Sequence, residues 1–165
     1  MNPRLKKKST SEDQYLEQII LSIESLPCDE YFSDHLGENQ SAQKSIVARF
    51  QKDLCVKLMQ DIPETQWRTE YTPNSTSRDS IDIFGENEDS VVAIELDKHR
   101  ADQVAKKFVS RVSALPHGKV YFVSLCYPGT ASMNKSECIK YFGYCADLAN
   151  RMGNAYAGFT VDSET

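Results

Sequence analysis

Hydrophobic positions along this chain follow two different spacings, which divide it into helices and strands. Apolar residues recur every three or four positions, as in amphipathic helices, in residues 12–26, 41–60, the stretch after Lys98, and 136–152. Alternating or continuous apolar runs, typical of strands, occupy residues 65–72, 80–84, 91–94, 119–126 and 155–161. The order α-α-β-β-β-α-β-α-β predicts an α/β protein. The runs at 91–94 and 119–126 are almost wholly apolar, so we expect central strands covered on both faces.

Length and composition indicate one domain. The chain has 165 residues, 40% of them hydrophobic, which is enough for a single core. We expect this domain to span residues 12–162, after a disordered basic tail at residues 1–11 (MNPRLKKKSTS). The net charge of −5 and the pI near 5.2 argue against a protein that coats nucleic acid through charge alone.

Cysteine usage and the absence of long apolar segments predict a soluble protein of the reducing cytoplasm. The five cysteines are scattered and never form a C-x-x-C pair, which argues against a disulfide framework or a zinc site. No apolar run approaches the length of a membrane span, and the N-terminal lysines are not followed by the apolar core of a signal peptide. We therefore expect no membrane partner.

Three acids would gather at one end of the sheet if two of the predicted strands pair as a hairpin. Asp82 lies within the first strand, and Glu95 and Asp97 follow the second. Because side chains alternate along a strand, Glu95 and Asp97 point the same way, and a hairpin with its turn at 85–89 would set Asp82 beside Glu95. Carboxylates this close raise one another's pKa unless a cation neutralises them, and a divalent ion with oxygen ligands is well suited to do so.

The helix that follows these acids carries a basic stripe. Its members at helical spacing are Arg100, Gln103, Lys107 and Arg111, and from Lys98 to Arg111 the chain has five Lys or Arg residues and one Asp. Cations beside a carboxylate cluster suit a site that binds the phosphate groups of a nucleic acid. Two simpler interpretations stay open: a solvated helix face, and acids that are solvated or paired with Lys98 and Arg100.

The order of elements and the acids together resemble the PD-(D/E)xK, or restriction-endonuclease-like, superfamily of nucleases. The resemblance covers residues 41–126 as an α-β-β-β-α-β core with a mixed central sheet, to which the chain adds an N-terminal helix and a C-terminal α-β extension at 136–161. It implies that Asp82 is the motif aspartate and Glu95 the first acid of the (D/E)xK element. It also implies a nuclease that cuts phosphodiester bonds, DNA being the first substrate to consider, with Mg²⁺ or Mn²⁺ held by Asp82, Glu95 and Asp97.

The third motif position departs from this family. Asp97 stands where the family usually has lysine, and Lys98 is one residue late, so its side chain would point to the other face of a regular strand. Either a bulge turns Lys98 back as the catalytic lysine, or Arg100 or Lys107 supplies the charge from the helix. Ile81 also replaces the proline that usually precedes the motif aspartate.

Other positions of the family pattern are met only loosely. Asp79 is a second candidate for the motif aspartate, and Glu38 is the one acid close to a helix at 41–60 that has no glutamate of its own. Gln103 lies where several lineages of the family have a helix glutamine near the substrate or a metal-bound water. A homodimer would allow a domain of this size to cut both strands of a duplex.

Two functions therefore stay open from the sequence. The first is a metal-dependent nuclease with Asp82, Glu95, Asp97 and Lys98 as catalytic residues. The second is a degenerate, non-catalytic member of the same fold that binds nucleic acid or a partner protein through the basic helix. A metal-independent enzyme has little support, because the chain has no P-loop, G-x-S-x-G or G-x-G-x-x-G motif.

Overall fold

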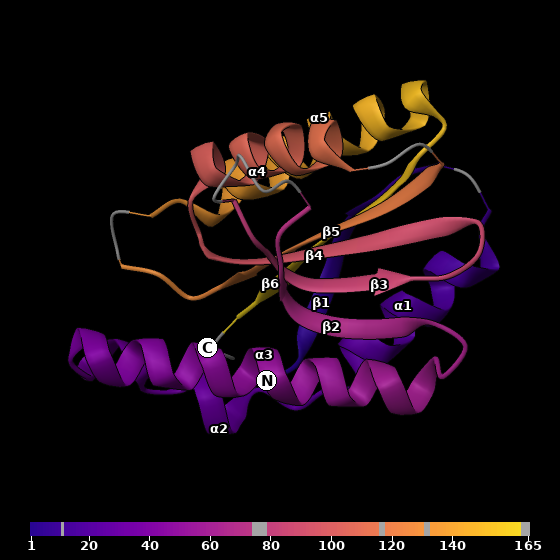
Figure 1. Ribbon diagram of the computed structural model, residues 1–165. Coiled ribbons are helices and arrows are strands. Elements are labelled where there is room, and N and C mark those ends of the chain that lie inside the picture. Colours follow the sequence, from indigo (N-terminus) through magenta and orange to yellow (C-terminus); the bar gives the residue numbers. More distant parts are fainter. Residues whose placement is uncertain (11, 74–78, 116–117, 131–132, 163–165) are drawn as a thin grey trace.

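The computed structural model describes residues 1–10, 12–73, 79–115, 118–130 and 133–162. They form a mixed six-stranded sheet in the order β1-β6-β5-β4-β3-β2 with helices on both faces (Figure 1), so the predicted α/β class is confirmed. The strands are β1 (Pro3–Lys8), β2 (Gln66–Tyr71), β3 (Ile81–Glu86), β4 (Ser90–Lys98), β5 (Lys119–Tyr127) and β6 (Ala155–Val161). The helices are α1 (Gln14–Glu24), α2 (Asp29–Phe32), α3 (Gln40–Asp61), α4 (Ala101–Ala114) and α5 (Lys135–Met152), with a 3-10 turn, η1, at His35–Gly37.

Strands β4 and β5 form the centre of the sheet and pair in parallel. β6 continues the parallel part, whereas β3 and β2 add antiparallel strands on the other side. Residues on both faces of β4 and β5 are buried, as their apolar runs predicted. β4 is longer than the predicted segment 91–94, because its ladder with β5 continues to the pair Lys98↔Tyr127. Glu95 and Asp97 therefore lie within a strand.

The turn between β3 and β4 begins later than the predicted 85–89, because Gly85 belongs to β3. Gly85 pairs with Trp67 of β2, and a Cβ atom at this glycine would lie 2.7 Å from the indole ring. The glycine therefore allows the tryptophan to pack closely against the sheet. The turn itself is closed by Asn87, whose Oδ1 accepts a hydrogen bond from the backbone N–H of Ser90 at 2.9 Å.

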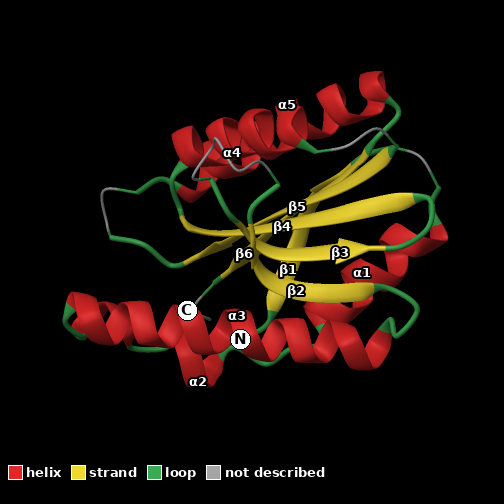
Figure 2. Ribbon diagram, viewed as in Figure 1, coloured by secondary structure: helices red, strands yellow, loops and turns green. Residues whose placement is uncertain are grey.

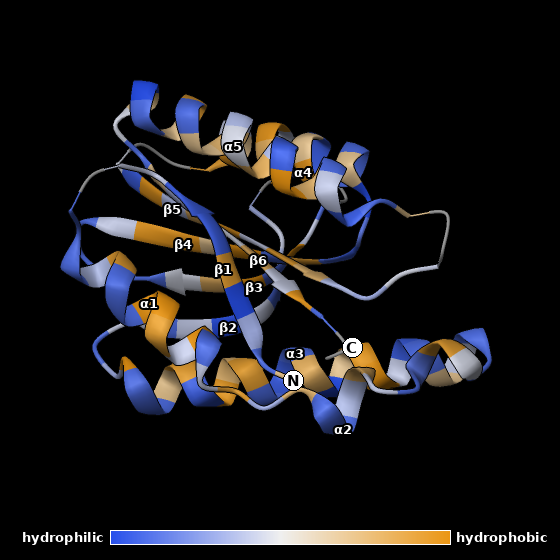
Figure 3. Cartoon of the chain, turned by 180° about the vertical axis from the view of Figure 1, so that it is seen from behind, coloured by the Kyte–Doolittle hydropathy of each residue, from blue (hydrophilic) through white to orange (hydrophobic). Residues whose placement is uncertain are grey.

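The prediction of a disordered tail at residues 1–11 is wrong for the segment that forms β1. This strand pairs antiparallel with β6, from Pro3↔Val161 to Lys8↔Ala157. It is an edge strand, and lysines are common there because they discourage pairing with other chains. In Figure 3 β1 is mostly blue, whereas much of β4 is orange. The backbone ladder places β1 in the sheet, and its polar composition hid it in the sequence.

The helices form a layer on each face of the sheet. Helices α1, α2 and α3 lie on one side, and α4 and α5 on the other (Figure 2). Each layer closes over its own apolar core, with Leu54 of α3 in the first and Phe108 of α4 in the second. No helix within the described ranges is long and apolar enough to cross a membrane. The start of β3 and the end of β4 thus lie between the two layers.

Candidate functional site

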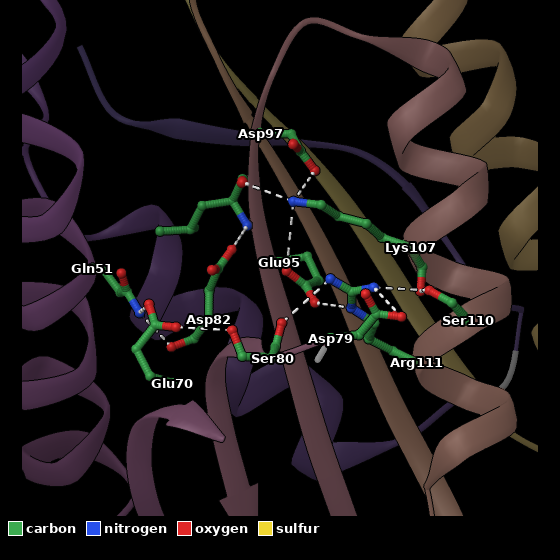
Figure 4. A network of polar contacts seen from close by, with 11 residues as sticks. Gln51, Glu70, Asp79, Ser80, Asp82, Glu95, Asp97, Lys107, Ser110 and Arg111 are labelled. Atoms are coloured by element: carbon green, nitrogen blue, oxygen red, sulfur yellow. Dashed lines mark hydrogen bonds and ion pairs between the residues drawn. The ribbon is translucent and has the colours of Figure 1, made fainter. Parts of the chain in front are cut away.

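The candidate site lies where β3 begins and β4 ends, between α3 and α4 (Figure 4). The pairing of β3 with β4 ends at Ile83↔Ile94. Asp82 then directs its side chain to β4, where its Oδ2 accepts a hydrogen bond from the backbone N–H of Leu96 at 2.8 Å. This bond takes the place of a ladder bond and fixes Asp82 near Glu95, close enough to raise the pKa of that residue. The predicted hairpin also placed Asp82 beside Glu95.

Glu95 is the buried centre of the site. Its side chain is 2% exposed, and its Oε1 accepts a hydrogen bond from Arg111 Nε at 2.7 Å. Its Oε2 has no hydrogen-bond partner among the described residues, and the nearest cation, Lys107 Nζ, is 3.7 Å away. Burial and the neighbouring Asp82 raise the pKa of Glu95 to about 8, although Lys107 and Arg111 act in the opposite direction. A proton or a cation is therefore the natural partner of Oε2.

Lys107 of α4 reaches over the end of β4 and meets three oxygens. Its Nζ lies 2.9 Å from Asp97 Oδ2, 3.5 Å from the Leu96 carbonyl oxygen and 3.7 Å from Glu95 Oε2. Burial alone would lower the pKa of Lys107, but Asp97, Glu95 and Asp82 together raise it. Burial is also the main cause of a raised pKa at Asp97, which Lys107 partly offsets. The ammonium group thus sits among oxygens that would also attract a metal ion.

Arg111, one turn further along α4, contacts both β4 and the chain just before β3. Besides its bond to Glu95, its Nη2 donates to the Ser80 carbonyl oxygen at 3.3 Å, and its Nη1 lies 3.6 Å from Asp79 Oδ2. Its Nη1 also donates to Ser110 Oγ at 2.9 Å. Asp79, the second candidate for the motif aspartate, therefore lies at the edge of the site and contacts Arg111.

The remaining predicted site residues lie apart from the acids. Lys98 points to the α3 side of the sheet, as strand alternation requires, and its Nζ donates to Gln43 Oε1 at 3.3 Å. Arg100 and Gln103 both contact Asp102, at 3.5 and 3.3 Å, on the first turn of α4. The predicted basic stripe is thus divided: Lys107 and Arg111 face the acids, whereas Arg100 is half exposed.

Two residues that the sequence did not single out complete the network. Gln51 of α3 is buried, and its Nε2 donates to the Asp82 carbonyl oxygen at 2.6 Å and to Glu70 Oε1 at 3.0 Å. Glu70 has a backbone φ of 54°, which is uncommon for a residue with a side chain, and its Oε2 accepts a hydrogen bond from Ser80 Oγ at 2.9 Å. One polar network thus runs from α3 to α4 (Figure 4). The alternating pattern of β2 gives no signal for this left-handed residue.

The acids do not converge as a set of three. Within the described ranges, no group of three or more His, Cys, Asp or Glu side chains is arranged to hold a metal ion. Asp97 is held by Lys107, which leaves Asp82 and Glu95 as adjacent carboxylates. Comparisons of the chain with protein-family models, with curated proteins and with solved structures give no match.

Proposed function

We propose that this site hydrolyses phosphodiester bonds of nucleic acid, with a divalent ion such as Mg²⁺ or Mn²⁺ bound at Asp82 and Glu95. The observation that carries the proposal is the buried Oε2 of Glu95, which lies beside a second carboxylate and has no hydrogen-bond partner among the described residues. Mg²⁺ usually binds through one or two carboxylates and fills its other positions with water and substrate phosphate. The donor set of Asp82 and Glu95 fits that description.

The order of elements supports a restriction-endonuclease-like fold for the proposed nuclease. Helix α3 is followed by the antiparallel strands β2, β3 and β4, then by the crossover helix α4 and by β5, which is parallel to β4. Asp82 and Glu95 stand in this order at the positions that the resemblance assigns to the motif aspartate and the first acid of (D/E)xK. The agreement of topology with motif position supports the family proposal more strongly than either alone.

The residues around the acids have distinct roles in this proposal. A bound divalent ion would supply an activated water and polarise the phosphate. Arg111 orients the Glu95 carboxylate and favours its ionised form. Lys107 takes the role that the family gives to its motif lysine: its ammonium can donate to a phosphate oxygen or to the attacking water, and Asp97 keeps it in place. Lys98, which the sequence favoured for this role, faces away from the acids.

A second candidate function is favoured by one specific observation. Lys107 and Arg111 already place two cations next to Glu95 and Asp97. Such a set of ion pairs is also what a degenerate, non-catalytic member of the same fold would retain for stability. That member would bind nucleic acid or a protein through the basic helix α4, beginning with Arg100, the half-exposed N-cap residue of that helix. Divalent-ion binding separates the two functions, because the non-catalytic protein has no need for it.

The proposed activity is tested with plasmid and oligonucleotide substrates, incubated with Mg²⁺ or with EDTA. Glu95→Gln keeps the shape of the side chain and removes its charge, so it should abolish metal-dependent cleavage. Glu86→Gln is the matched control, since Glu86 also lies in this sheet but is exposed and pairs with Arg68. Cleavage that survives in Glu95→Gln, or that needs no metal, would refute the proposal.

A further inference from the structure

A cavity of about 520 Å³ opens on the α3 side of the network, at the ends of β4 and β5. Its volume falls within the range of about 300–1,000 Å³ that is typical of small-molecule sites. Gln51 and Glu70, which belong to the polar network, also line this cavity. The cavity is therefore continuous with the candidate site and is linked to Asp82 through the Gln51 amide.

One part of the cavity wall combines two cations with an amide group. Lys44 of α3 and Lys98 of β4 contribute two ammonium groups, and Gln43 contributes an amide whose oxygen accepts from Lys98. An ammonium has three donors, so Lys98 can bind a phosphate oxygen and keep its bond to Gln43. Together these groups suit a single bound phosphate.

Glu70 supplies the opposite charge at another part of the wall. Each of its oxygens accepts one hydrogen bond, from Gln51 and from Ser80, and a carboxylate has about four acceptor sites. The left-handed backbone at Glu70 and these two bonds hold the carboxylate at the cavity. A carboxylate in this setting accepts from an exocyclic amine of a nucleobase, as Asp and Glu do with cytosine N4. The ring of Tyr127 adds apolar surface.

We propose that this cavity binds one unpaired nucleotide whose base carries an exocyclic amine, with its phosphate at Lys44 and Lys98 and its base at Glu70. A base within a duplex is paired and stacked, so it can enter such a cavity only from a single strand or after extrusion. The proposal rests on the proposed nuclease function for its biological meaning and narrows the substrate class to single-stranded or unpaired nucleic acid. Binding itself requires neither metal nor cleavage.

The test measures binding in EDTA, so that it does not depend on cleavage. The mononucleotides dCMP and dUMP, which differ at the pyrimidine 4-position by an amine against a carbonyl, are titrated into the full chain and followed by amide chemical shifts. Fluorescence anisotropy with labelled oligo(dC), oligo(dU) and a hairpin duplex then measures binding of a strand, which is compared with binding of the free nucleotides. Lys98→Ala and Lys44→Ala remove the phosphate contacts, and Glu70→Gln changes the base contact. Lys52→Ala, an exposed lysine of the same helix outside the cavity, is the control.

We expect dCMP to bind more tightly than dUMP, and oligo(dC) more tightly than both oligo(dU) and the duplex. Lys98→Ala and Lys44→Ala should each weaken oligo(dC) binding by about tenfold, and Lys52→Ala should leave it unchanged. Glu70→Gln should remove most of the preference of dCMP over dUMP. Each lysine substitution at the cavity should also reduce the slope of log K against log salt by about 0.7.

Three results would overturn this inference and leave the nuclease proposal standing. They are equal binding of dCMP and dUMP, cavity variants that bind like Lys52→Ala, and preferential binding of the duplex. Conversely, selective binding of oligo(dC) by a protein that cuts no substrate with Mg²⁺ would support the cavity inference and refute the nuclease proposal. The two proposals therefore fail through different measurements.

Discussion

Lys107 Nζ lies 2.9 Å from Asp97 Oδ2, although the two residues belong to different elements, helix α4 and strand β4. In the proposed nuclease, Lys107 takes the role that the family gives to a strand lysine. We predict that Lys107→Ala reduces the rate constant of nucleic acid cleavage by at least about a hundredfold, because one electrostatic donor at a developing charge has this effect in other enzymes.

Lys98→Ala should have a different kinetic effect from Lys107→Ala. Lys98 lines the cavity next to Gln43 and faces away from Glu95, so its loss should raise KM for a single-stranded substrate and leave kcat nearly unchanged. Steady-state cleavage kinetics of the two variants measure the difference. A drop in kcat for Lys98→Ala, with normal turnover in Lys107→Ala, would return the catalytic role to the strand lysine.

The buried pair of Arg111 and Glu95 gives a prediction about stability. Arg111 is 11% exposed and Glu95 2%, and the Arg111 Nε lies 2.7 Å from the Glu95 Oε1. Arg111→Met leaves the carboxylate buried without its main partner and should lower the free energy of unfolding by about 3 kcal/mol in urea titrations. Arg100→Ala removes a half-exposed ion pair with Asp102 and should change the free energy of unfolding by less than about 0.5 kcal/mol.

Adding Glu95→Gln to Arg111→Met checks the cause of this loss. The double variant carries no buried charge at the position of Glu95, so it should recover most of the stability that Arg111→Met loses. If the stability lost by the double variant instead equals the sum of the losses measured for Arg111→Met and Glu95→Gln, the destabilisation comes from lost packing and not from the buried carboxylate.

Much of this site follows from patterns that the sequence displays. The alternation in residues 80–84, the apolar run at 91–94 and the polar turn between them were enough to place Asp82 beside Glu95. The same alternation placed Lys98 on the opposite face, where the structure has it. Local periodicity was sufficient because these features depend on strand geometry alone.

Other features depend on contacts between distant segments, which periodicity does not encode. The inward orientation of Lys107 is fixed by how α4 packs on β4, and the same stripe reads equally well as a solvated helix face. Glu70 has its left-handed backbone between the pairs Thr69↔Ile83 and Tyr71↔Ile81 of the β2–β3 ladder, and the alternating pattern of β2 does not encode it. β1 belongs to the sheet through backbone pairing with β6, although its own side chains are polar.

Asp13 gives a prediction about the pH dependence of stability. It caps α1 through the Leu16 N–H at 3.0 Å and accepts hydrogen bonds from Lys119 and from the Tyr121 hydroxyl. Burial opposes the ionised form of Asp13, but these partners outweigh it and lower its pKa. The carboxylate therefore stabilises the fold fully above the pKa of an unfolded aspartate, about 3.9, and this contribution disappears as the pH falls through the lower folded value.

Urea unfolding of the wild type and of Asp13→Asn measures this contribution. The stability difference between the two proteins should be largest at about pH 6 and should shrink toward about pH 3. A difference that is independent of pH would show that the cap and the packing of Asp13, and not its charge, carry the effect.

Removal of residues 1–8 tests the role of β1. The truncated chain keeps Ser9 but exposes the edge of β6, so we expect its Tm to fall by more than about 5 °C and the protein to associate as its concentration rises. Thermal unfolding and size-exclusion chromatography measure the two effects. Lys7→Ala, which changes an exposed side chain and keeps the strand, is the control. An unchanged Tm would mean that the segment adds nothing to the sheet.

The most direct test of the proposed metal-dependent site is an isothermal titration of Mn²⁺ into the wild type, Asp82→Ala and Asp102→Ala. Asp102 is an exposed acid of α4 outside the pair of Asp82 and Glu95, so it serves as the control. We predict that the wild type and Asp102→Ala bind the ion, and that Asp82→Ala does not. A wild type that binds no Mn²⁺ even with nucleic acid present, or an Asp82→Ala variant that binds it equally well, would contradict a metal-dependent function at this site.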